Sequence, residues 1–114
     1  MLSYPIHASL PKLQKYVEAK CLERGFNHAS NLEVFLLFSE EIGEMAKAIR
    51  NCQQLFQETD KAVTPKNEQE ARAQLAEEMS DVLSYLLDLA NRYDIDLDEA
   101  FSRKETLNDQ RRWQ

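Results

Sequence analysis

Two long stretches of this chain repeat apolar residues at helical spacing with almost no interruption. In residues 31–54 and again in residues 68–93, apolar side chains recur every three or four positions, which is typical of an amphipathic helix. The full chain of 114 residues contains only 2 Gly and 3 Pro. So few turn-forming residues cannot supply the many tight turns of a multi-stranded sheet. The sequence therefore predicts an all-α protein.

Capping residues divide the chain into about four main helices. The candidate N-caps are Ser9, Ser30, Asn67 and Asp96. Gly25 is expected to end the first helix, and residues 26–29 are expected to form a connecting loop. Residues 55–66 are sparse in apolar side chains and predict a second, longer loop. The length suits a single domain over residues 1–114.

Charge and composition exclude several classes of function. The formal net charge is −6, which argues against a nucleic-acid polymer as the main partner, because such partners attract basic surfaces. No apolar run reaches the roughly 18 residues of a membrane span, and no basic segment followed by an apolar run indicates a secretory signal. Cys21 and Cys52 have neither metal-ligand nor redox spacing. We therefore expect a cytoplasmic protein with no membrane partner and with reduced thiols.

The two long helices carry broad apolar faces. On the second helix the centre of this face holds Phe35, Phe38, Ile42, Met45, Ala46 and Ile49. On the third helix the face holds Leu75, Met79, Val82, Leu83, Leu86, Leu89 and Ala90. One subunit of this size cannot cover both faces, so the sequence predicts a homo-oligomer, with a dimer as the minimum.

Two pairs of acids border these apolar faces. Glu41 and Glu44 stand three residues apart on the second helix, and Glu78 and Asp81 stand three apart on the third. Residues with this spacing project from nearly the same side of a helix, so two facing pairs present four oxygen ligands to a hard divalent cation. The alternative interpretation is a non-catalytic acidic helical oligomer, a binding module whose acids are simply solvated.

The motifs around these acids resemble those of the MazG-like, all-α nucleoside triphosphate pyrophosphohydrolases. The matching segments are Glu40-Glu41-Ile42-Gly43-Glu44, Glu78-Met79-Ser80-Asp81 and a closing pattern of Lys104, Asn108 and Arg111. The resemblance covers roughly residues 30–112, and order and spacing make it specific where each short motif alone is weak. The stretch from Met45 to Glu77 is longer than the family pattern, and the 55–66 loop most simply holds the excess.

The resemblance implies a metal site and a reaction. The implied ligands of Mg²⁺, with Mn²⁺ as a substitute, are Glu41, Glu44, Glu78 and Asp81. The implied substrate is a nucleoside triphosphate cleaved at the α–β linkage to a nucleoside monophosphate and pyrophosphate, as in house-cleaning of the nucleotide pool. Glu41 is the candidate general base. A phosphoribosyl-ATP pyrophosphohydrolase or a dUTPase-like relative is an alternative with the same chemistry.

The resemblance also implies substrate-binding residues and an assembly. Lys104 and Arg111 would meet phosphate oxygens, and Asn108 would donate a hydrogen bond. Tyr85 and His28 are candidates for contact with the base, although Tyr85 equally suits a half-buried aromatic residue and His28 an exposed loop histidine. The family pattern implies a homodimer or a homotetramer.

Overall fold

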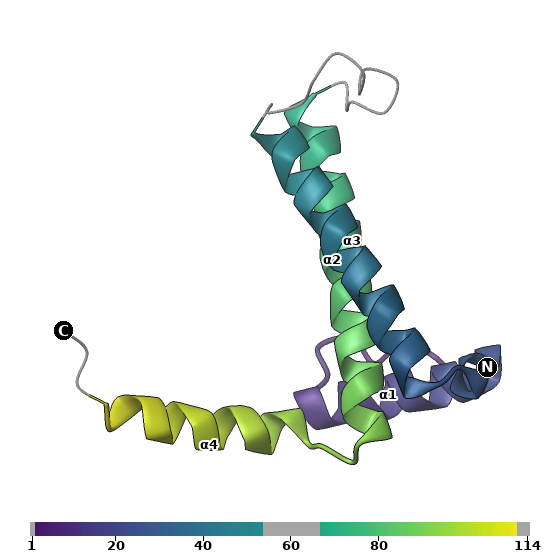
Figure 1. Cartoon of the computed structure of the whole chain (residues 1–114), viewed down its shortest axis with the longest axis vertical. Coiled ribbons are helices and arrows are strands. Elements are labelled where there is room, and N and C mark those ends of the chain that lie inside the picture. Colours follow the sequence, from purple (N-terminus) through teal and green to yellow (C-terminus); the bar gives the residue numbers. More distant parts are fainter. Residues whose placement is uncertain (1, 54–66, 112–114) are drawn as a thin grey trace. The chain divides into compact units, whose positions relative to one another are not determined.

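The computed structural model of the chain describes residues 2–53 and 67–111 (Figure 1). Its elements are α1 (Leu10–Arg24), the 3-10 turn η1 (Phe26–His28), α2 (Asn31–Cys52), α3 (Glu68–Arg92) and α4 (Leu97–Asp109). No strand occurs in the described ranges, so the all-α prediction with four main helices is confirmed. The predicted 55–66 loop lies outside the described residues. None of the helices in these ranges has the length and apolarity needed to cross a membrane.

Local sequence signals account for most of the helix ends. Gly25 adopts a left-handed φ of 79° and donates its N–H to the carbonyls of Cys21 and Leu22, which ends α1. The Asp96 carboxylate accepts from the N–H groups of Asp98 and Glu99 at the start of α4. The Asn67 side chain likewise accepts from the N–H of Glu70 at 2.8 Å. Ser9 is the N-cap of α1 but its side chain makes no capping hydrogen bond.

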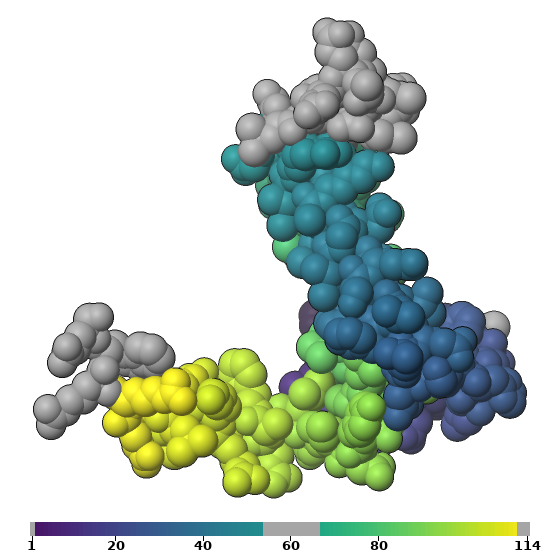
Figure 2. Space-filling view, in the orientation of Figure 1, coloured from purple at the N-terminus to yellow at the C-terminus, as the bar shows by residue number. Residues whose placement is uncertain are grey.

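The chain forms two compact units. The first unit contains the residues up to Asn31 and those from Leu87 onward, and the second contains Leu32–Leu86. In the first unit α1 packs against η1 and α4, and Leu87 is its most buried large apolar side chain, with 1% exposed. The side chains of α4 are mostly exposed, as the yellow-green surface in Figure 2 shows.

A buried glutamine connects α1 to the corner between α3 and α4 within the first unit. Gln14 is 6% exposed, and its Nε2 donates to Asn91 Oδ1 at 3.2 Å and to the Ile95 carbonyl at 2.9 Å. Its Oε1 accepts from the Leu97 N–H at 2.8 Å. Asn91 returns a bond of 2.9 Å from its Nδ2 to the Gln14 carbonyl. Both amides are therefore satisfied, as buried polar groups require.

The second unit is an antiparallel pair of helices, formed by most of α2 and α3 (Figure 1). In its interior, each helix contributes one row of residues that recur every seven positions. We call these two rows the seam, and they consist of Val34, Glu41 and Ala48 on α2 and of Ala71, Glu78 and Tyr85 on α3. Val34, Ala48 and Ala71 are 2%, 5% and 4% exposed, and the other three are half-buried. The two alanines leave room for the helices to approach closely.

The predicted apolar centre lies beside this seam and is partly uncovered. On α2, Phe35, Ile42 and Ile49 are each one residue after a seam position and are 51%, 41% and 42% exposed. On α3, Met79 and Leu86 are also one residue after the seam and are 49% and 40% exposed. One residue turns a helix by about 100°. Because the helices are antiparallel, these positions fall on one side of the pair, which we call the apolar side.

Candidate metal centre

The antiparallel pairing of α2 and α3 brings acids of both helices together. Glu41 is the central seam residue of α2, and Glu78 is the central seam residue of α3. The carboxylate oxygens of Glu41, Glu78 and Asp81 include one from each residue that all lie within 4.8 Å of one another. Glu41 and Glu78 are half-buried and Asp81 is exposed. The three form a compact set of oxygen donors at the edge of the helix pair.

Glu44 and Asp81 both follow a seam acid by three residues. Three residues rotate a helix by about 300°, so these acids turn away from the apolar side and toward the opposite, acidic side of the pair. Glu44 is exposed and is not among the three acids that share the 4.8 Å cluster. The structure thus groups three of the four predicted ligands and leaves Glu44 at their border.

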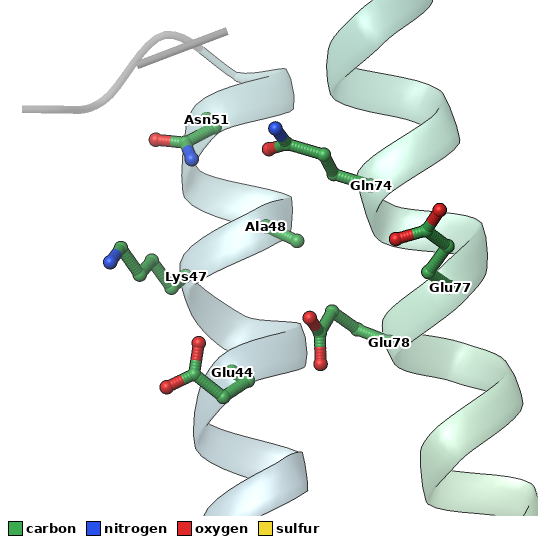
Figure 3. A pocket seen from close by; sticks show the side chains of 7 residues that line it. All are labelled: Glu44, Lys47, Ala48, Asn51, Gln74, Glu77 and Glu78. Carbon is green, nitrogen blue, oxygen red and sulfur yellow. The ribbon is translucent and has the colours of Figure 1, made fainter. Parts of the chain in front are cut away.

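A groove of about 290 Å³ continues from the acids along the two helices (Figure 3). It is lined by Glu44, Lys47, Ala48, Asn51, Gln74, Glu77 and Glu78. The groove therefore includes Glu77, which is exposed, and the amides of Asn51 and Gln74, which the motifs did not indicate. Of the seam residues, Ala48 and Glu78 line this groove, and the seven-residue spacing of the seam is the sequence signal that could have located them.

Burial and the neighbouring acids raise the pKa of Glu41. Burial contributes most to this rise above the ordinary value of 4.5, followed by a hydrogen bond with Glu78 and by the charges of Asp81, Glu78 and Glu44. Carboxylates held this close repel one another when all are ionised, and a divalent cation among them removes the repulsion. Oxygen ligands in this number and spacing fit a hard cation such as Mg²⁺ or Mn²⁺.

The other predicted site residues lie on two further parts of the chain. Tyr85 is half-buried, in the seam one turn after Asp81. Lys104 and Asn108 are one turn apart on α4, and Arg111 follows two residues after its end. The spacing of four places Lys104 and Asn108 on one side of α4, whereas Arg111 lies beyond the helix. They belong to the first unit, whereas the acids belong to the second.

The turn η1 holds the remaining candidate, His28. Within the connecting loop predicted over residues 26–29, residues 26–28 form one 3-10 turn, and the Ala29 N–H donates to the Phe26 carbonyl. His28 is exposed, and Phe26 is 56% exposed beside it. Two exposed rings thus share one ordered turn of the first unit.

Comparison with known protein families gives one match. The family model for the MazG nucleotide pyrophosphohydrolase domain matches residues 27–109. That range contains both acid pairs, His28, Lys104 and Asn108, and it leaves out Phe26 and Arg111. No curated protein matches the chain. Because the domain match spans most of the 114 residues, the chain belongs to the MazG nucleotide pyrophosphohydrolase family.

Proposed function

We propose that this protein is a Mg²⁺-dependent nucleoside triphosphate pyrophosphohydrolase that cleaves canonical or damaged (d)NTPs at the α–β linkage. The observation that carries this proposal is the cluster of Glu41, Glu78 and Asp81 within 4.8 Å, in a chain that matches a nucleotide pyrophosphohydrolase family. Pyrophosphate and a nucleoside monophosphate are the products. Removal of unwanted nucleotides from the pool is the role that such a reaction serves.

Glu41, Glu44, Glu78 and Asp81 are the residues that would hold the cation. When bound, Mg²⁺ supplies positive charge that neutralises triphosphate oxygens and lowers the pKa of a bound water. Glu41 suits the role of general base, because its half-buried carboxylate lies within the acid cluster, where it could take a proton from the attacking water. The water oxygen forms a new bond to the α or the β phosphorus, and the P–O bond that links these two phosphates breaks. The departing group, pyrophosphate for attack at the α phosphorus or the nucleoside monophosphate for attack at the β phosphorus, takes the electron pair of that bond.

Residues of the first unit are proposed to bind the rest of the substrate. Lys104 and Arg111 would bind phosphate oxygens, and Asn108 would donate a hydrogen bond from the same side of the helix. His28 would contact the base. Tyr85, in the second unit, would border it. These assignments rest on the family motif and on the shared face of Lys104 and Asn108.

We also propose a homodimer, or a homotetramer built from such dimers, formed through the apolar side. A second copy of the chain is the occupant that suits this surface, because the surface is apolar while the opposite side of the same helix pair is acidic. The assembly would cover the partly exposed side chains of the apolar side, which are Phe35, Ile42 and Ile49 on α2 and Met79 and Leu86 on α3.

A panel of NTPs and dNTPs assayed with Mg²⁺ tests the reaction. We expect pyrophosphate among the released products. Glu41→Gln or Glu78→Gln should lower turnover by about 100-fold or more, while the circular dichroism of the helices stays unchanged. Glu68→Gln, an exposed substitution on the same helix as Glu78, is the matched control and should leave turnover unchanged. Release of orthophosphate alone would refute α–β cleavage.

The same panel separates the alternatives. Including dUTP and phosphoribosyl-ATP among the substrates distinguishes a general pyrophosphohydrolase from its specialised relatives. A chain that cleaves no nucleotide, and whose thermal stability is unaffected by Mg²⁺, would support the non-catalytic binding module.

A further inference from the structure

Arg92, in the last turn of α3, connects that helix to the turn η1 by several hydrogen bonds. Its Nη1 donates to the Ala29 carbonyl at 2.6 Å and to Asn31 Oδ1 at 3.2 Å. Its Nη2 donates to the Phe26 carbonyl at 3.0 Å. All of these groups belong to the first unit. One guanidinium therefore binds both ends of the segment that displays Phe26 and His28.

A buried carboxylate fixes the orientation of this guanidinium. Asp88 is 8% exposed and accepts from Arg92 Nε at 3.0 Å, one helical turn away. The Arg92 side chain is itself 14% exposed. A charge-assisted bond in such a shielded position has a defined geometry. The planar fork of arginine can then direct both of its terminal nitrogens at the turn.

The turn packs against α1, but its own backbone hydrogen bonds are long. The His28 N–H reaches the Gly25 carbonyl at 3.4 Å, and the Ala29 N–H reaches the Phe26 carbonyl at 3.2 Å. Both are long for N–H···O bonds. Phe26 and His28 are exposed, so packing does not hold their rings in place. The bond from Arg92 to the Ala29 carbonyl, at 2.6 Å, is shorter than either of these backbone bonds, so Arg92 is a strong restraint on the segment.

We infer that Arg92, oriented by Asp88, is a positioning residue that holds η1 in the conformation that binds the nucleobase. This inference rests on the proposed function and deepens it, because it assigns base affinity and base selectivity to a residue that does not touch the base. A turn ordered before binding loses less conformational entropy when the substrate arrives, which favours affinity. The proposed metal ligands belong to the other unit and are not among the hydrogen-bond partners of Arg92.

Arg92→Lys tests the inference in the full-length protein. Lysine keeps the charge beside Asp88 but cannot reach three acceptors on the turn at once. We expect KM for the preferred nucleotide to rise on the order of tenfold, kcat to stay within about twofold, and selectivity between bases to fall. Hydrogen exchange at the amides of His28 and Ala29 should accelerate.

Two further variants keep the test decisive. Asn31→Ala removes one acceptor on an exposed residue, so folding is preserved, and it should raise KM in the same direction by about threefold. Arg72→Lys, exposed on the same helix, should change neither KM nor amide exchange. Wild-type KM, selectivity and exchange in both Arg92→Lys and Asn31→Ala would overturn the inference while the pyrophosphohydrolase proposal stands. A wild-type protein that cleaves no nucleotide would overturn that proposal instead.

Discussion

Glu41 lies at a position where packing favours an apolar side chain and the proposed metal site requires a carboxylate. It occupies a position in the seam that its neighbours seven residues away, Val34 and Ala48, fill with buried apolar side chains. A carboxylate there loses hydration and lies beside Glu78 and Asp81. The resulting unfavourable charge is what a bound cation would relieve, so the residue that weakens the metal-free fold is the one that favours metal binding.

The raised pKa of Glu41 predicts how stability depends on pH and metal. The pKa of Glu41 is higher in the folded state than its ordinary value of 4.5. Protonation of Glu41 therefore stabilises the folded state fully at a pH below about 4.5, and this stabilisation is lost as the pH rises through the raised pKa. At pH 7, without metal, Glu41→Gln should therefore melt a few degrees higher than wild type. Thermal unfolding by circular dichroism measures this.

Adding Mg²⁺ should reverse that order. The wild-type melting temperature should rise with Mg²⁺ concentration, because the cation binds only the folded state, whereas Glu41→Gln should respond weakly. Equal responses of the two proteins would contradict the assignment of Glu41 as a ligand. The Glu68→Gln variant should behave as wild type throughout.

At the scale of the elements, the α2–α3 pair has two chemically distinct sides. Positions one residue after the seam are apolar and partly exposed, and positions three residues after the seam acids are Glu44 and Asp81. This arrangement needs only a seven-residue repeat on each helix and antiparallel pairing. Ala48 and Ala71 are small and buried, which allows the helices to approach closely beside the cluster of Glu41, Glu78 and Asp81.

Ala48→Leu should disturb this approach. Ala48 is 5% exposed, so a larger side chain must push the helices apart and should lower the free energy of unfolding by about 1–3 kcal/mol. The affinity for Mg²⁺ should fall as well, because the ligands of the two helices separate. Urea denaturation and a Mg²⁺ titration measure the two effects. Ala73→Leu, at an exposed position of α3, should alter neither.

Local signals allowed the helices to be predicted, whereas the seam could not be. Gly25, Asn67 and Asp96 act through bonds to their immediate neighbours, so the sequence alone reveals them. Which side of α2 faces α3 depends on contact between distant segments. Summing apolarity around the helix favoured Phe35, Ile42 and Ile49, but small residues and the acids form the interior. The hydrogen bond from Arg92 to the Ala29 carbonyl joins residues 63 positions apart in the sequence, so it could not be predicted for the same reason.

At the scale of the whole molecule, the family and the acid cluster could be predicted from the sequence, whereas the full set of substrate-binding residues could not. Both acid pairs follow from spacing on single helices, and the family match covers them. The roles of Lys104, Asn108 and Arg111 stay predictions, because they belong to a different compact unit from the acids. Spacing along one helix predicts which side of the helix a residue occupies. It does not predict which residues of another unit contact that side.

The apolar side predicts an assembly of more than one chain. At micromolar concentration the wild-type protein should show at least twice the monomer mass by light scattering. Ile49→Glu should shift it toward the monomer, because a charge placed among apolar side chains at an interface is strongly unfavourable. Ile49 is 42% exposed and lies away from the acid cluster, so the monomeric variant should remain folded. Ile6→Glu, at a position 73% exposed outside the helix pair, should leave the mass unchanged. A wild-type protein that is already monomeric would exclude the second copy as the occupant of this surface.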